Sequence, residues 1–569
     1  MISDLPKEFP LIALGQMDLG VAEARDDALL LQCATPLPMF QEITTGKKDI
    51  IHGYRGSGKS SIVRLLAEKA LLFDAEPGFS NHVLVIDEEL EYRSIRDYLS
   101  RQTEKGTSTS LLLRVVWDVL ICYRAMKYLQ EALGDADVTL REKITDIEVL
   151  FGVTKRKVGF VELILTQKKK LGVKIDTNLP TLVDIYAGLE PASPSSEPEN
   201  ISVLKLVEHI KYVVRLLREK KLTLHVLLDR LDDFVVQEEY EIQRSLLQQL
   251  LACQADYRSK YGQGRLKIIT FLRTDLFVRI DQQSLGPDKV AQRSLEIRWT
   301  PSDIRRFIAK RVALNLLRSL KRESLELQID TARCWITREE IGKLEESKTT
   351  LQNFDMLKKS HWEKLFWLLK ILQRSNQAET RISSFDDAYN EAIITSLFPR
   401  VIKPVAVRGE SREIPLFDFL DTHFQLGFGQ CTPRVILLYL SEVLRASTDY
   451  YASNPDLRVI QNSHKEFELF KRESLGIAYA NFRRTMWEIQ LQIAGSFRPL
   501  MMQLNILRIR DRFSFRTFSQ GVEISGDEVK RFLGFCTHTG LLQCVNPNAR
   551  EHDREYKVPL VYQTAKQEC

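Results

Sequence analysis

One short stretch constrains the fold more than any other feature of the chain. The segment "GYRGSGKS" has the spacing G-x-x-x-x-G-K-S, from Gly53 to Ser60. It follows "KKDIIHGY", an apolar run that predicts a short strand, and precedes "SSIVRLLAEKALLF", whose apolar residues repeat with a helical period. A strand, a glycine-rich turn and a helix in this order predict the first unit of an α/β domain with a parallel sheet.

The composition of this turn suits phosphate. Glycine at three of its positions lets backbone N–H groups turn inward around phosphate oxygens, and the helix that begins near Lys59 adds its dipole. The Lys59 ammonium reaches β- and γ-phosphates in such turns, and the Ser60 hydroxyl is a ligand for Mg²⁺. The sequence therefore predicts a P-loop that binds ATP and Mg²⁺. The predicted nucleotide-binding residues of the loop are Gly53, Tyr54, Arg55, Gly56, Ser57, Gly58, Lys59, Ser60 and Ser61.

Two apolar strands that end in carboxylates compete to supply the acid for the metal. "HVLVID" ends in Asp87, one helix and one strand after the P-loop, whereas "LTLHVLLD" ends in Asp229 much later in the chain. The later position requires an insertion, and a predicted lysine-rich β-hairpin and a Pro/Ser/Glu-rich linker at about 140–200 provide one. We favour Asp229, because "LKIITFLRTD" follows it where the next strand of the sheet is expected. Asp87 is then an ordinary acid at a strand end.

Composition narrows the class of protein. The chain has 569 residues, 44% hydrophobic and 28% charged, which predicts several globular domains, and its net charge of +5 neither requires nor excludes nucleic acid. The eight cysteines are scattered and form no CxxC pair, which argues against disulfides or a zinc site and favours a reducing, cytoplasmic setting. No apolar run approaches the ~20 residues that cross a membrane, and the acidic, proline-broken N-terminus is not typical of a signal peptide.

The pattern along the chain predicts three domains. Strand-like and helix-like segments alternate over 1–300, which indicates an α/β P-loop core; residues 301–450 are mostly helical and are expected to form a lid. Within 451–569 the chain ends with a helix, a strand, a polar turn and a strand, which is typical of a winged helix. The lysines at 168–170 suit contact with a phosphate backbone, but such charge runs are more often solvated. Winged helices frequently lie on DNA, and many serve only as protein contacts.

The segment "LLDRLDD" resembles the acidic motif of STAND-type and related AAA+ P-loop ATPases, in which the strand ends D-G-x-D-E. The resemblance implies that Asp229 holds Mg²⁺ through water, and that Asp232 and Asp233 polarise the water that attacks the γ-phosphate. Arg230 stands where the family has glycine, and Asp233 where it has glutamate. "IITFLRTD" resembles the next strand of that family, which ends in an arginine near the γ-phosphate, so Arg273 is implied in catalysis.

A further arginine lies in "GQCTPRVILLYLSEVL". Thr432 suits a helix N-cap and Pro433 the first helical position, which places Arg434 in the first turn. A cation there opposes the helix dipole and requires an anion. AAA+ lids use a similar arginine to sense the γ-phosphate, so the resemblance implies that Arg434 contacts nucleotide. A solvated or carboxylate-paired arginine is the equal alternative.

The wider pattern is similar to an incompletely characterised group of bacterial P-loop ATPases that often lie in antiviral defence loci. It comprises "AEARDDALLLQC", "GKKDIIHGYRGSGKSS", "VLLDRLDDF", "FLRTDLF" and "IRWTPSDIRRFIAKR". The resemblance implies an ATPase switch that forms a homo-oligomer and acts with a separately encoded effector protein. A DNA-binding AAA+ initiator or transposition ATPase is the alternative. Arg305, Arg306 and Arg311 are expected on a helix after the core, with Arg305 and Arg306 on its polar side. One of the three is expected to reach a neighbour's nucleotide; a solvated helix surface is the other interpretation.

Overall fold

The computed structural model describes residues 14, 17–35, 37–87, 109–134, 137–151, 198–231, 240–261, 263–280, 286–322, 387–404, 412–454, 469–506, 512–522 and 524–563. Its contacts divide the chain into two compact units. The sheet unit comprises Met39–Tyr54 and Ile62–Ile297, and the helical unit comprises Met1–Pro38, Arg55–Ser61 and Arg298–Cys569. The predicted hairpin and most of the predicted linker lie outside the described residues, and the three predicted domains stay a prediction.

The sheet unit is built on a parallel sheet, as the sequence predicts. Among the described residues five strands form it, in the order β2-β3-β4-β1-β5, and every paired neighbour is parallel. The strands are β1 (Ile50–Gly53), β2 (Ser80–Ile86), β3 (Leu222–Leu228), β4 (Leu266–Arg273) and β5 (Ser294–Glu296). All seven residues of β3 are buried, as expected for a strand covered on both faces, and they include the polar Thr223 and His225.

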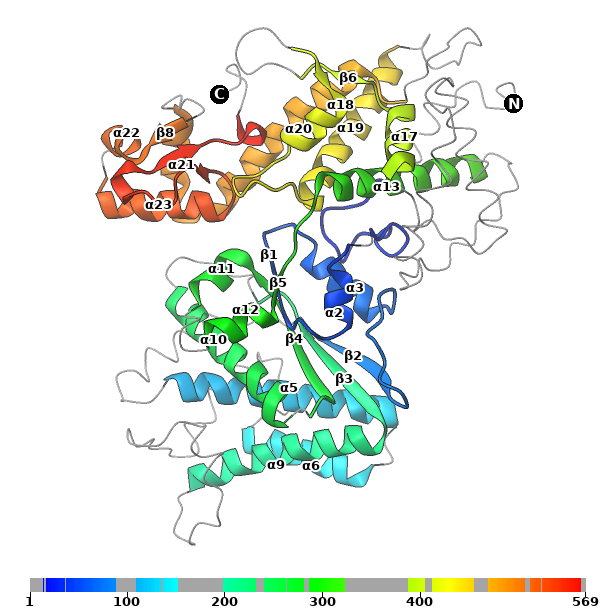
Figure 1. Cartoon of the computed structure of the whole chain (residues 1–569), viewed down its shortest axis with the longest axis vertical. Coiled ribbons are helices and arrows are strands. Elements are labelled where there is room, and N and C mark those ends of the chain that lie inside the picture. Colours follow the sequence, from blue (N-terminus) through cyan, green and yellow to red (C-terminus); the bar gives the residue numbers. More distant parts are fainter. Residues whose placement is uncertain are drawn as a thin grey trace. The chain divides into compact units, whose positions relative to one another are not determined.

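Helices cover both faces of this sheet. The chain passes from β1 to β2 in one direction across the sheet and from β3 to β4 in the other, so right-handed crossovers place α3 (Lys59–Ala67) and α10 (Tyr240–Asp256) on opposite faces (Figure 1). Helix α5 (Thr109–Leu133) packs against α10, and α6 (Val138–Phe151) and α9 (Pro198–Glu219) pack against α5. The Trp117 indole of α5 donates to the Leu246 carbonyl of α10 at 2.8 Å. The linker predicted to reach residue 200 ends earlier, because α9 begins at Pro198.

The rest of the sheet unit joins these elements. Short helix α2 (Phe40–Thr44) precedes β1, and the π-helical turn η3 (Tyr257–Tyr261) follows α10. Between β4 and β5 lie α11 (Thr274–Arg279) and α12 (Pro287–Arg293).

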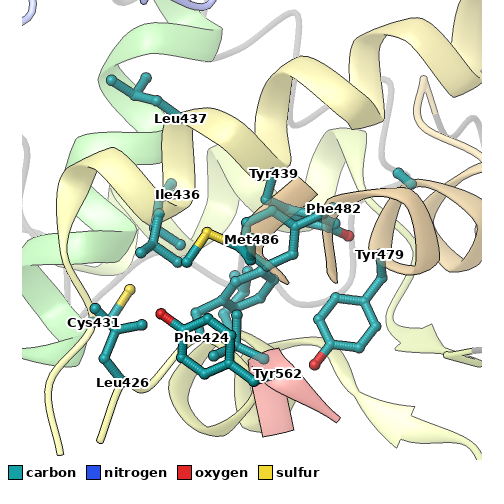
Figure 2. Packing of buried hydrophobic residues seen from close by; sticks show 14 of the residues in the cluster. Phe424, Leu426, Cys431, Ile436, Leu437, Tyr439, Tyr479, Phe482, Met486 and Tyr562 are labelled. Carbon is teal, nitrogen blue, oxygen red and sulfur yellow. The ribbon is translucent and has the colours of Figure 1, made fainter. Parts of the chain in front are cut away.

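The helical unit packs long amphipathic helices around an aromatic core. Its longer helices are α13 (Pro301–Arg322), α17 (Asp387–Leu397), α19 (Pro433–Ser453) and α20 (Arg472–Ile493), with the short α18 (Leu416–Thr422) and the paired strands β6 (Val401–Ile402) and β7 (Ile414–Pro415) beside them. Tyr439 of α19 and Phe482 of α20 lie with their ring centroids 5.7 Å apart, and the Phe424 ring lies 4.7 Å from Tyr439 (Figure 2). This core fixes α19, and therefore the residues at its N-terminus.

The last elements of this unit form a small antiparallel sheet with helices. They are η7 (Gly495–Phe497), α21 (Arg498–Ile506), β8 (Arg512–Ser514), α22 (Phe515–Gln520), α23 (Gly526–His538), β9 (Gln543–Cys544), η8 (Glu551–Asp553), β10 (Glu555–Lys557) and η9 (Leu560–Tyr562). The strands pair in the order β8-β10-β9. The hydroxyl of Ser525 accepts from the Glu528 N–H and so caps α23. Nowhere among the described residues is a helix both long and apolar enough to cross a membrane.

Candidate glycine-rich loop and strand-end site

The glycine-rich loop, residues 54–58, has the backbone that its glycines predict. Gly56 (φ +80°) and Gly58 (φ +97°) lie in the left-handed region, where a side chain is strained, and α3 begins at Lys59. Gly53 differs from the prediction, because it is still part of β1, where it is in register with Arg273. Two of the three glycines, at 56 and 58, therefore make the turn.

The loop packs tightly within the helical unit. A Cβ at Gly56 would lie 2.7 Å from the Cβ of Arg434 and 3.1 Å from the Thr432 hydroxyl. The Trp299 indole donates to the Ser57 carbonyl at 2.8 Å and lies in van der Waals range of Gly58. A side chain at position 56 has no room, so glycine is required there by space as well as by φ.

Trp299 was not among the predicted site residues. The sequence signal that marks it is a lone tryptophan just before α13. Thr300 and Asp303 cap the start of that helix, because each backbone N–H donates to the other's side chain, at 3.0 and 3.2 Å. A contact between residues 57 and 299 does not follow from any local pattern.

The predicted side chains of the loop differ in burial. Lys59 is buried, with 9% of its surface exposed, and Ser57 is buried with no hydrogen-bond partner for its hydroxyl. Ser60 and Ser61, the next two residues of α3, are half-buried. Tyr54 is also half-buried, and Arg55 is exposed.

Helix α19 begins where the sequence predicts. Thr432 is its N-cap, with extended backbone, and Pro433 its first residue. The Thr432 side chain makes no capping bond, and its buried hydroxyl has no hydrogen-bond partner. Arg434 lies in the first turn and is paired with the Glu23 carboxylate. Of the two alternatives for this arginine, the structure therefore contains a carboxylate-paired one.

The two competing acids follow different strands of the sheet. Asp229, directly after β3, is buried, and its N–H donates to the Ile86 carbonyl at 3.1 Å. Asp87 follows β2 at the edge of the sheet. Burial lowers the pKa of Arg124, and the negative charge of Asp87 partly offsets this lowering. Strands lie about 4.8 Å apart, so β3 is roughly 10 Å from β1 and β2 roughly 14 Å. The strand of Asp229 is the nearer one. Asp232 and Asp233 lie outside the described residues.

Arg273 is the last residue of β4, the strand between β3 and β1. Its guanidinium makes two hydrogen bonds with the Asp275 carboxylate, at 2.9 and 2.7 Å. This pair balances much of the arginine's charge inside the sheet unit. A phosphate would have to compete with Asp275 for it.

The interpretation of a solvated helix surface is wrong for Arg311. Only 1% of its surface is exposed; its guanidinium pairs with Asp27 and donates to the Leu19 carbonyl at 2.9 Å. Arg305 is held by Glu391 at 2.8 Å and by Asp421. Arg306 lies 3.5 Å from Asp303. All of these partners belong to the same unit as α13. The sequence did not predict the pairs, because an amphipathic period does not distinguish a solvated charge from one that bonds to another segment.

Comparison of this chain with known proteins identifies no relative. Models of protein families, curated proteins and solved structures were each searched, and none of them matches this chain.

Proposed function

We propose that this protein is an ATPase whose bound nucleotide controls its conformation and its assembly. One observation carries the proposal. A buried strand runs into a loop with two left-handed glycines, and the buried Lys59 opens the helix that follows. Backbone N–H groups and a helix N-terminus that begins with lysine form a site for polyphosphate.

The strand order supports the same position for the ligand. Adjacent strands β1 and β4 send their connections to opposite faces of the sheet, β1 toward β2 and β4 toward β5. In open parallel sheets, ligands bind outside the carboxyl ends of the strands at such a switch point. The glycine-rich loop begins at the carboxyl end of β1, and Asp229 follows the second strand away.

The residues present fit Mg²⁺ only together with the phosphates. Among the described residues no cluster of three or more His, Cys, Asp and Glu side chains is placed to hold a metal. Mg²⁺ in nucleotide sites takes few protein ligands and several phosphate and water oxygens. We propose the Ser60 hydroxyl and the Asp229 carboxylate as its protein ligands. The ion would neutralise charge on the phosphates. Lys59 would bind the β- and γ-phosphates, and Asp232 and Asp233 are proposed to orient the attacking water.

The experiment is ATP binding by Lys59→Ala. Losing a charge-assisted contact removes on the order of 2 kcal/mol, so affinity should fall about 30-fold, with the fold intact by circular dichroism. Lys48→Ala is the matched control, because Lys48 is a partly exposed lysine that pairs with Glu42 and should leave affinity unchanged. ATP binding that is equal in wild type and Lys59→Ala would overturn the proposal.

Assembly is tested separately. We propose that ATP promotes self-association and recruits an effector protein encoded separately, as in antiviral defence. Mass photometry with and without a slowly hydrolysed ATP analogue should show a larger species only with the analogue, and Lys59→Ala should stay at the smaller mass. Equal masses under all conditions would contradict self-association.

A DNA-binding initiator or transposition ATPase is the second candidate, and the last part of the chain favours it. We propose a winged helix here, and the order α21, β8, α22, α23, β9, β10 and the β8-β10-β9 pairing support that proposal. Against DNA, α23 begins with Asp527 and Glu528, and its Lys530 pairs with Glu551. Salt-sensitive binding of duplex DNA that Lys530→Glu and Arg531→Glu abolish would support this candidate.

A further inference from the structure

The side chain of Arg434 packs against the glycine-rich loop, and its guanidinium forms an ion pair with a residue of another segment. The Cβ of this side chain lies 2.7 Å and its Cδ 3.3 Å from where a Cβ at Gly56 would be, so the arginine stem passes directly over the loop glycine. Its backbone N–H faces the Gly56 carbonyl at 3.4 Å. The guanidinium pairs with the Glu23 carboxylate. Gly56, Arg434 and Glu23 all belong to the helical unit.

Glu23 is presented from a turn that is fixed by buried contacts. Its carbonyl accepts from the N–H groups of Asp26 and Asp27, both at 3.1 Å. The Asp27 carboxylate is buried against Arg311 of α13, and Lys310 of the same helix donates to the Ala34 carbonyl at 2.8 Å. These buried contacts fix the segment against α13 and keep the Glu23 carboxylate close to Arg434.

The two ends of this pair differ in exposure. The side chain of Glu23 is 65% exposed and that of Arg434 is 24% exposed. An ion pair of this kind contributes little, because water screens it, and the carboxylate stays hydrated when the pair opens. A terminal phosphate carries more charge and more acceptor oxygens, so it forms a stronger charge-assisted contact with the same guanidinium.

We propose that Glu23 competes with the terminal phosphate of the nucleotide for Arg434, and so determines how well the site distinguishes ATP from ADP. ATP opens the Glu23–Arg434 pair because its γ-phosphate replaces the carboxylate. ADP has no γ-phosphate and leaves the pair closed. Part of the contact energy of ATP is then used to displace Glu23, so the carboxylate weakens ATP binding and leaves ADP binding unaffected. This inference rests on the proposed ATP site.

The test compares Glu23→Gln with wild type by calorimetric titration of the full chain, using Mg²⁺ with a slowly hydrolysed ATP analogue and Mg²⁺ with ADP. The glutamine keeps the shape and removes the charge, so affinity for the analogue should rise about two- to fivefold, the range expected for an exposed ion pair, with ADP affinity unchanged. Glu413→Gln is the matched control. Glu413 also forms an exposed pair with an arginine of the helical unit, Arg472, and its loss should change neither affinity.

A double-variant cycle makes the test specific. In an Arg434→Gln background, Glu23→Gln should not change the affinity for the analogue, because the guanidinium for which Glu23 and the phosphate compete is absent. An unchanged affinity ratio in Glu23→Gln, or the same gain with Arg434 absent, would overturn the role of Glu23. If Lys59→Ala still lowers ATP affinity in that case, the proposed ATP site stands without a role for Glu23. A wild-type chain that binds no ATP would overturn both.

Discussion

Arg230 holds a left-handed backbone, with φ at +59°, directly after Asp229. Residues with a Cβ pay about 1–2 kcal/mol for this conformation. Replacement by glycine should therefore give a more stable protein than replacement by alanine, by about 1 kcal/mol in urea denaturation. In ordinary backbone alanine is the more stable of the two. An alanine variant as stable as the glycine variant would show that the backbone at 230 is not left-handed.

The same residue shows what a motif can and cannot predict. Arg230 departs from the D-G-x-D-E pattern, and its residue type predicts no turn. Yet it adopts a left-handed conformation, which glycine supplies without strain. Residue type alone therefore misses the left-handed turn after β3.

At the scale of elements, the strand order separates the two candidate acids. Asp229 follows β3, two strands from β1, and Asp87 follows the edge strand β2. Asp229→Asn should lower ATP turnover about 10- to 100-fold, the usual loss when a group that supports a metal is removed. Asp87→Asn should stay within about twofold. Phosphate release measured on both variants decides the assignment, and a loss confined to Asp87→Asn would reverse it.

Strand β3 also carries a pH-sensitive side chain. His225 is buried; its Nε2 bonds to the Asn81 side chain at 3.1 Å, and its ring stacks on Phe73 at 3.7 Å. Burial, with a smaller contribution from Lys267, lowers the pKa of His225 to about 3. The unfolded chain takes up the proton near pH 6.5, so stability falls as pH drops from 6.5 toward 3.

The loss at pH 5 should be on the order of 2 kcal/mol, from about 1.5 pH units at 1.36 kcal/mol each. His225→Phe removes this titration. Its free energy of unfolding should therefore fall less between pH 7 and pH 5 than that of wild type, in denaturant series at both pH values. Parallel losses in the two proteins would mean that His225 is protonated in the fold.

Local patterns account for the elements and not for the contacts that assemble the candidate site. The strand before Gly53, the helix from Lys59 and the start of α19 at Pro433 follow from apolar period, glycine positions and capping residues. The contact of Trp299 with Ser57 and the pair of Glu23 with Arg434 join segments hundreds of residues apart. Such pairs depend on tertiary packing, which cannot be predicted from the spacing of residues along a single sequence.

At the scale of the whole molecule, the buried pair of Asp27 and Arg311 joins the segment at 17–35 to α13. Asp27→Ala leaves a guanidinium buried without its anion, so the free energy of unfolding should fall by about 3–5 kcal/mol. The double change of Asp27→Leu and Arg311→Met removes both charges and should cost less than the single change. Glu413→Ala breaks an exposed pair and should cost under about 1 kcal/mol. Chemical denaturation of the three variants tests whether burial of the pair determines how much the free energy of unfolding falls. If it falls equally in Asp27→Ala and Glu413→Ala, the pair of Asp27 and Arg311 does not anchor the segment that carries Glu23.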